Sequence, residues 1–308
     1  MNVNVSILGA LLPIFAVILS GYAFRRVRFP GDEFWPYAEQ FTYFVLFPAL
    51  LLQKTATAAL DVRTIGPLVA VLYAAVLAMT GLLLLIRPWR TFGAKAFTSF
   101  YQGSIRFNTY VGLSAAYALF GNQGLTLAAV VIAVLIPLIN TLCVTILVVF
   151  SDSGRKNWRT VLSAVIRNPL IISCVAGILL NVSGIGLHRV VSDTLLLFGR
   201  ASLPLGLIAL GAGLDLASVR ASRNIIVYNC GLKLLVLPLL MWTASLALNI
   251  PAEAAAIAVL FAALPGSPTS YILSRQLGGD SLLMAHIVTA QVMLSMLTLP
   301  AIMAVTLG

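Results

Sequence analysis

Charged side chains are scarce in this sequence, and acidic ones are the scarcest. Only 9% of the 308 residues are charged and nine are Asp or Glu, whereas 60% are hydrophobic. A water-soluble globule of this length needs far more polar side chains to cover its surface. We therefore exclude a soluble protein and expect membrane lipid to be the main solvent of the chain.

The sequence is equally poor in the side chains that build catalytic and metal sites. It holds two histidines, His188 and His286, so no HExxH motif, Ser/His pair or similar hydrolytic constellation is available. The cysteines Cys143, Cys174 and Cys230 lie singly in apolar runs without CxxC spacing, which argues against disulfides and zinc. We accordingly expect no enzyme, no metal site and no cofactor.

What the chain does have is a series of apolar runs of about twenty residues, the length that a helix needs to cross a bilayer. They predict ten membrane-spanning helices, numbered here helix 1 to helix 10, at residues 5–24, 36–53, 64–86, 97–120, 124–150, 168–186, 193–214, 224–248, 252–275 and 281–306. The first run has no basic residue before it and no cleavage site after it, so we expect a retained helix rather than a signal peptide.

Basic residues give the chain a net charge of +10. They form no single stripe with exposed aromatics, so a nucleic-acid partner is not indicated. Instead, thirteen of them lie in the loops after the odd-numbered helices: Arg25, Arg26, Arg28, Arg87, Arg90, Lys95, Arg155, Lys156, Arg159, Arg167, Arg220, Arg223 and Arg275. The opposite side holds Lys54, Arg63 and Arg189. The positive-inside rule then predicts a multi-pass cytoplasmic (inner) membrane protein with both termini periplasmic or extracellular.

The two halves of the sequence share their helix-breaking residues. A shift of 156 residues superposes Pro13 on Pro169, Gly21 on Gly177 and Pro48 on Pro204, and a shift of 157 superposes Gly121 on Gly278. Because five helices per half is an odd number, the second copy enters the membrane from the other side. We therefore predict two inverted five-helix repeats, residues 1–150 and 168–308.

Two of the predicted helices contain segments that a continuous helix in lipid would not select. Helix 4 is polar and glycine-containing across residues 102–114, and helix 9 carries Pro265 and Pro268 around a Gly-Ser pair. Broken helices leave free N–H groups on one half and free C=O groups on the other. We expect the two broken helices to cross near the middle of the bilayer and form a polar site that holds an anion.

Arg106 lies about ten residues into helix 4, close to the expected bilayer centre. An unpaired Arg there costs about 2.5–3.5 kcal/mol on insertion scales, so it needs an anionic partner. Two interpretations stay open at this point. Arg106 pairs with a protein carboxylate, Glu39 or Asp215, or it contacts a carboxylate of the substrate.

The predicted substrate site consists of the two interrupted segments and two polar residues of helix 10. Its members are Arg106 as the anion contact, Asn108, Tyr110, Ser267 and Thr269 as neutral hydrogen-bonding groups, Thr109, Gly112, Pro265, Gly266 and Pro268 as the rest of the interruptions, and His286 and Gln291. The last two either line the cavity or form a packed, hydrogen-bonded pair. Arg200 and Lys233 lie within about two turns of predicted helix ends, where such side chains reach the interface or contact the substrate.

The sequence of the first interruption, Asn108-Thr-Tyr-Val-Gly112-Leu, resembles the Asn-Thr-x-x-Gly-Leu-Pro crossover of the auxin efflux carrier family. Bacterial members of that family include malonate and malate carriers. Residues 263–280, 43–51 and 167–169 are also similar to family segments, so the likeness spans the chain. Ser114 stands where the family has the proline, and only the short segment 151–167 separates helices 5 and 6, where plant members have a long loop.

This resemblance implies an all-α, ten-helix fold like that of bile-acid symporters. It implies a scaffold from residues 5–53 and 168–214, a moving transport unit from residues 64–150 and 224–306, and a homodimer that contacts through the scaffold. The implied function is secondary transport of a small organic anion by an elevator-type, alternating-access mechanism. An anion channel or a substrate-sensing membrane protein is the alternative.

Acidic residues are missing from both interruptions. Sodium sites usually include a carboxylate, and proton relays need a titratable group at membrane depth. A cationic Arg106 nearby would further weaken sodium binding. We therefore expect uniport or exchange of the anion without sodium, with proton coupling through His286 as the alternative.

Overall fold

The computed structural model of the chain describes residues 7–58, 62–86, 89–150, 167–215 and 223–307. These residues form helices and contain no strand, which confirms the predicted all-α class. The predicted loop 151–167, apart from Arg167, lies outside the described residues, and so do Arg87 and Arg220.

Helical segments occupy each of the ten predicted spans, with ends that differ by a few residues. Six described segments are long and apolar enough to cross a membrane: Ile7–Arg26, Ile65–Ile86, Ala94–Phe150, Arg189–Ala212, Arg223–Ala247 and Ser281–Leu307. The segment Ala94–Phe150 holds two predicted spans in one run. The apolar helices Pro169–Val182 and Ala252–Ala263 are shorter. The number of crossings therefore stays a prediction.

The chain divides into two compact units, each made of three stretches of sequence. The first unit contains Met1–Asp61, Tyr110–Ile136 and Ile166–Leu214, and the second contains Val62–Thr109, Pro137–Val165 and Asp215–Gly308. The chain changes unit inside predicted helices 4 and 5, whereas the resemblance assigned those helices whole to a transport unit. Which unit moves stays a prediction.

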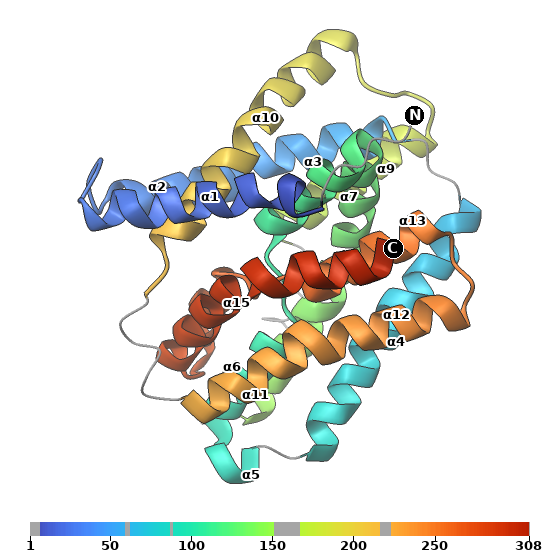
Figure 1. The fold of residues 1–308 in the computed structure, drawn as a ribbon. Helices are drawn as coiled ribbons and strands as arrows, with labels where there is room; N and C mark the ends of the chain where they lie inside the picture. Colours follow the sequence, from blue (N-terminus) through green and yellow to red (C-terminus); the bar gives the residue numbers. More distant parts are fainter. Residues whose placement is uncertain (1–6, 59–61, 87–88, 151–166, 216–222, 308) are drawn as a thin grey trace. The chain divides into compact units, whose positions relative to one another are not determined.

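The first unit is built from helices whose bounds follow the predicted spans 1, 2, 6 and 7, together with part of span 4 and part of span 5 (Figure 1). Its elements are α1 (Ile7–Arg26), α2 (Phe34–Phe41), the π-helical turn η1 (Thr42–Leu46), α3 (Phe47–Ala56), the first part of α7 (Thr109–Phe150), α9 (Pro169–Val182) and α10 (Arg189–Ala212). Within this unit α1 packs on α10 and α3 packs on α9.

Two glycines let these helix pairs touch through their backbones. Gly21 of α1 lies against the carbonyl of Ile208 in α10, and Gly177 of α9 lies against Leu52 in α3. A Cβ atom at either glycine would overlap the facing helix. The two contacts are equivalent under the 156-residue shift, because Gly21 maps onto Gly177 and Leu52 maps onto Ile208.

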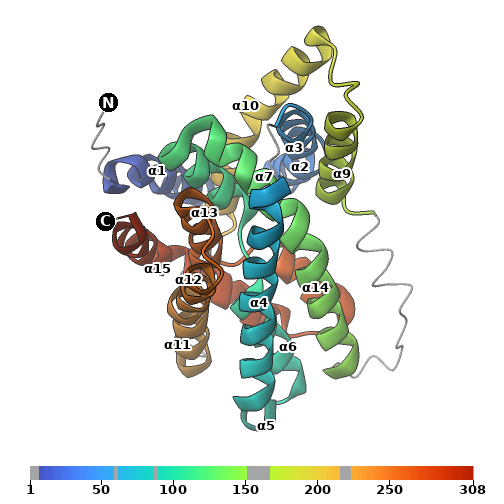
Figure 2. The same ribbon diagram turned by 90° about the vertical axis from the view of Figure 1, so that its right-hand side faces the viewer.

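The second unit contains the remaining helices. They are α4 (Val62–Ile86), α5 (Trp89–Phe92), α6 (Ala94–Ile105), the last part of α7, α11 (Arg223–Gly231), the π-helical turn η3 (Leu232–Val236), α12 (Leu237–Ala247), α13 (Ala252–Ala263), α14 (Thr269–Leu277) and α15 (Ser281–Leu307). In this unit α12 lies beside both α4 and α13 (Figure 2), and α6 packs on α11 and α15.

Prolines and glycines explain where the helices deviate. The turns η1 and η3 end two residues before Pro48 and Pro238. A proline has no N–H and pushes away the carbonyl four residues earlier, which here lies in the turn. Gly121, inside α7, and Gly278, after α14, both adopt positive φ, 60° and 79°. These are the two glycines that the 157-residue shift superposes, and a residue with a side chain adopts such φ values at a cost.

Candidate functional site

Both predicted interruptions are present in the structure. α6 ends at Ile105, Arg106 is extended (φ −73°, ψ 152°), and α7 begins at Thr109. α13 ends at Ala263, and Leu264 is extended in the same way (φ −65°, ψ 147°) before α14 begins at Thr269. The first break contains no proline, and Ser114 stands where the resembled family has one. The helix is nevertheless interrupted between Ile105 and Thr109.

The two interruptions meet within the second unit. The backbone N–H of Asn108 donates a hydrogen bond to the carbonyl of Pro265 at 2.8 Å. The rings of Phe107 and Phe261 pack edge to face beside it, with centroids 5.3 Å apart. We call residues 106–108 and 264–268 together the crossing. Because Pro265 has no N–H, it cannot return the bond, so the backbone link runs in one direction.

Arg106 brings a positive charge into the crossing and meets only neutral groups there. Its half-buried guanidinium donates to the amide oxygens of Gln102, at 3.3 Å, and Asn140, at 2.6 Å. In the described part of its own unit, no carboxylate pairs with it. Amide dipoles stabilise the guanidinium but leave its net charge uncompensated.

Gln291 of α15 links the two interrupted helices through one side-chain amide. Its oxygen accepts the N–H of Gly266 at 2.6 Å, and its nitrogen donates to the carbonyl of Gly103 at 2.9 Å and to Asn229 at 2.7 Å. Gly103 lies in the last turn of α6, whose carbonyls lack helical partners. With most of its hydrogen-bonding capacity used, buried Gln291 is suited to positioning the crossing.

A buried polar network extends from Gln291 along α6. Asn229 of α11 donates to the carbonyl of Phe100 at 2.6 Å and to the hydroxyl of Ser104 at 2.9 Å. Gln102 donates to Ser274 of α14 at 2.8 Å. Gln102 and Ser104 lie in the polar stretch singled out from the sequence but were not predicted as site residues, and Asn229, Ser274 and Asn140 were not predicted at all. An amide inside an apolar run is a signal that could have found Asn229 and Asn140.

Lys233 occupies the carbonyl end of α13. Its ammonium donates to the carbonyl of Ala262 at 3.0 Å, and the residue is fully buried. The expectation that Lys233 reaches the interface is therefore wrong. Lys233 is near enough to a helix end for its side chain to extend to the membrane interface, but it lies on the face of the helix that packs against α13. A cation at the C-terminal end of a half-helix is favoured by the helix dipole.

The second interruption also contains a small hydroxyl cluster. The Ser267 and Thr269 hydroxyls lie 2.9 Å apart, and the backbone N–H of Thr269 points to the Ser267 oxygen at 3.4 Å. Ser267, Pro268 and Thr269 are half-buried, so a small molecule can approach them. The start of α14 therefore offers hydroxyls and a helix N-terminus, both suited to an anion.

Two predicted site residues belong to the first unit, and a third, His286, makes no hydrogen bond within the described residues. Tyr110 and Gly112 belong to the first unit, where the Tyr110 ring stacks on Phe47 at 4.7 Å. His286 is buried in α15, and neither of its ring nitrogens has a hydrogen-bond partner. No bond joins His286 to Gln291, so these two residues are not a hydrogen-bonded pair.

Comparison with known proteins identifies the kind of protein to which this crossing belongs. Residues 151–303, about half of the chain, match the sequence profile of the family described as membrane transport protein. No curated protein matches the chain. Apolar helices of membrane-crossing length agree with an integral membrane protein. The profile match, together with two helices interrupted at the predicted residues, shows that the chain belongs to this membrane transport protein family, the auxin efflux carrier family.

Proposed function

We propose that the chain is a secondary transporter of a small organic anion, and that the crossing is its binding site. One observation carries the proposal: Arg106 stands in the crossing with neutral amides as its partners. A buried or half-buried cation without a counter-charge is costly, and a mono- or dicarboxylate would supply that charge. Membership in a transport family supports movement of the bound anion rather than its chemical conversion.

The groups around Arg106 suit a carboxylate. The planar guanidinium can present two parallel N–H donors to a carboxylate, which an ammonium cannot. Hydroxyls of Ser267 and Thr269 and the N–H groups at the start of α14 add neutral donors from the second break. Asn108 and Gln291 hold the two breaks in register through the bonds described above.

The proposal includes an inverted-repeat architecture. It is supported by the equivalent backbone contacts of Gly21 and Gly177, and by the bond between Asn108 and Pro265, which differ by 157 residues, the offset that also relates Gly121 to Gly278. A two-fold axis brings equivalent residues together. An elevator-type movement, a homodimer, and termini outside the cytoplasmic membrane belong to the same proposal.

Counterflow in proteoliposomes tests the function. Vesicles containing purified protein and an excess of unlabelled malonate, malate or a monocarboxylate are given a trace of the same labelled anion. A carrier accumulates the label transiently and saturates with concentration. Flux that rises linearly without counterflow would indicate the anion channel, and binding without flux would indicate the sensor; either result overturns the proposal.

A further inference from the structure

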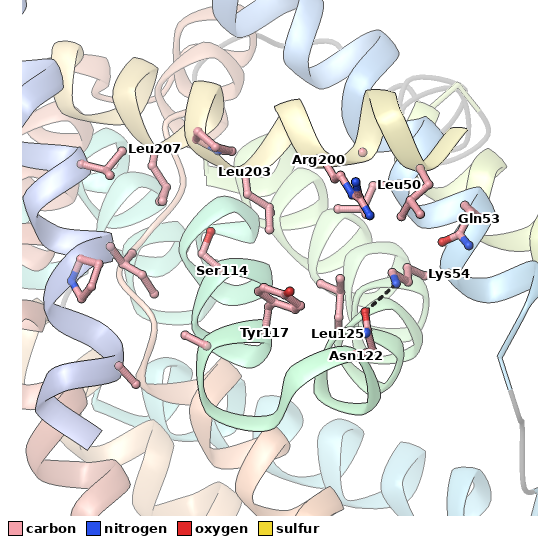
Figure 3. A pocket seen from close by; sticks show the side chains of 18 of the residues that line it. Leu50, Gln53, Lys54, Ser114, Tyr117, Asn122, Leu125, Arg200, Leu203 and Leu207 are labelled. Atoms are coloured by element: carbon pink, nitrogen blue, oxygen red, sulfur yellow. Dashed lines mark hydrogen bonds between the residues drawn. The ribbon is translucent and has the colours of Figure 1, made fainter. Parts of the chain in front are cut away.

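The first unit contains a cavity of about 830 Å³ that the proposed transport site does not use (Figure 3). It is lined by α1, α3, α10 and the stretch of α7 on either side of Gly121, and it opens to the surface of the unit. Most of its lining is apolar. The polar side chains that line it are Gln53, Lys54, Ser114, Tyr117, Asn122 and Arg200.

Two cations face this cavity. The Lys54 ammonium donates to the Asn122 amide oxygen at 3.0 Å, and Arg200 is near enough for its charge to repel that of Lys54. Figure 3 shows Lys54, Gln53 and Arg200 at one end of the cavity and Leu207 toward the other. Among the described lining residues there is no Asp or Glu. An anion is therefore the ligand that would relieve the repulsion.

Two buried polar atoms on the cavity wall lack hydrogen-bond partners. They are the amide oxygen of Gln53 and the hydroxyl of Ser114, in residues that are 8% and 6% exposed. Buried polar side-chain atoms in proteins nearly always have a partner. Neither atom is open to the cavity in this conformation. Rotation of the Ser114 side chain can bring its hydroxyl to the lining, where it can donate to an anion.

Arg200 lies near the middle of α10, farther from a helix end than the sequence predicted. The side chain of Arg200 is exposed and that of Lys54 is half-buried, so the cationic end of the cavity lies at its opening. The lining next to Arg200 is apolar, with Leu203 and Pro204 on the same helix and Leu50 on α3. The cavity thus combines a cationic end with an apolar body.

We propose that this cavity binds an amphipathic organic anion, with a carboxylate or phosphate head between Lys54 and Arg200 and an apolar body along the leucine and proline lining. The volume lies in the usual range for small-molecule sites, about 300–1,000 Å³. A small inorganic ion would leave the apolar lining uncovered. The same chemistry belongs to a free organic acid and to an anionic lipid, and the experiment below separates the two.

The test uses full-length protein in nanodiscs of zwitterionic phosphatidylcholine, with octanoate as the probe and calorimetry as the readout. We expect the Lys54→Met/Arg200→Met variant to bind octanoate at least about tenfold more weakly, because both counter-charges are lost. Ser114→Ala should lose a few-fold. Arg189→Met is the matched control, because Arg189 is an exposed cation on the same helix that is absent from the cavity lining.

Two further arms make the result specific. The arms are repeated in the Arg106→Ala background, where octanoate cannot use the cation of the crossing. The loss in the Lys54→Met/Arg200→Met variant should persist there, which separates this cavity from the crossing. If an anionic lipid is the occupant, wild-type protein in nanodiscs with phosphatidylglycerol should bind no octanoate, because the lipid fills the cavity. In the Lys54→Met/Arg200→Met variant, phosphatidylglycerol should then no longer affect octanoate binding. Octanoate affinity within twofold of wild type in the double variant, equal affinity for octanol, or no binding of either probe to wild type would overturn the proposal.

Discussion

The two compact units hold their helices together by different means. In the first unit, Gly21 and Gly177 bring helix backbones into direct contact, and Asn181 of α9 adds hydrogen bonds to the carbonyls of Ala56 and Ala58 at the end of α3. In the second unit, the amides of Gln291, Asn229 and Gln102 join interrupted helices through buried hydrogen bonds. Close backbone packing keeps a fixed geometry between continuous helices. A polar network instead satisfies the groups that broken helices expose.

This difference teaches where a ligand can act. Broken helices expose backbone dipoles at a defined point, and the described part of the second unit satisfies some of them but offers no carboxylate to Arg106. The backbone contacts of the first unit offer no such dipoles. Changing the Arg106 cation should therefore reduce transport, whereas changing the polar network or the backbone contacts should reduce stability.

The largest effect should come from Arg106→Ala. Truncating one partner of a charge-assisted hydrogen bond costs about 2–5 kcal/mol, so we expect anion uptake to fall by about a hundredfold or more while the protein still folds. Arg106→Lys should retain part of the activity, since it keeps the charge but loses the planar fork.

Initial-rate uptake in proteoliposomes measures the loss, and Arg275→Ala, which removes an exposed Arg from α14 of the same unit, is the control. Uptake by Arg106→Ala equal to that of the control would show that the guanidinium has a structural role alone.

Gln291→Leu should come next, and its effect should be on stability. The substitution leaves the N–H of Gly266 and the carbonyl of Gly103 buried without their partner. Each such group costs about 1–3 kcal/mol, so we expect a loss on the order of 3 kcal/mol and a clear fall in melting temperature. Ser295→Ala is the control, because its hydroxyl bonds only within α15, to Val292. Equal melting temperatures for both variants would remove Gln291 from the network that joins the breaks.

Gly21→Ala and Gly177→Ala should destabilise the first unit by similar amounts, about 1–3 kcal/mol, because each added methyl overlaps the facing helix. Gly81→Ala in α4 should be neutral or stabilising, since nothing lies within 4 Å of the added atom. Thermal unfolding of the three purified variants measures this. A large difference between the first two would contradict their equivalence in the proposed repeat.

The smallest effect should come from replacing sodium with choline, which we expect to change uptake by less than about twofold. The Lys233 ammonium already holds the carbonyl end of α13, where a bound cation would otherwise be favoured. A several-fold drop would contradict this. Collapse of the pH gradient gives the second comparison: a drop that disappears in His286→Gln would favour proton coupling through that buried imidazole.

The sequence was sufficient to locate the breaks, because their causes are local. Pro265, Pro268 and a polar stretch beginning at Gln102 each disfavour a continuous apolar helix, and the structure interrupts both helices there. The positions of the helices followed from the length of the apolar runs. The positive φ of Gly121 and Gly278 agrees with the 157-residue shift, which superposes these two helix-breaking residues.

The partners of the site residues could not be predicted in this way. Gln291 meets Gly103 and Arg106 meets Asn140 across long separations in sequence, so tertiary packing alone decides these pairs. The same holds for Lys233, whose helical face, rather than its distance from a helix end, determines that it is buried. α7 is apolar along its whole length, so its hydropathy does not indicate that the chain passes from the first unit to the second at Pro137.

The neutral surroundings of Arg106 also bear on how the membrane potential would act on the carrier. If the crossing moves as proposed, the charge of Arg106 moves through the field with the empty carrier, and each elementary charge is worth about 2.3 kcal/mol for each 100 mV. Binding of a monocarboxylate lowers the charge of the moving unit by one, and binding of a dicarboxylate lowers it by two. The voltage dependence of exchange should therefore report the charge of the natural substrate.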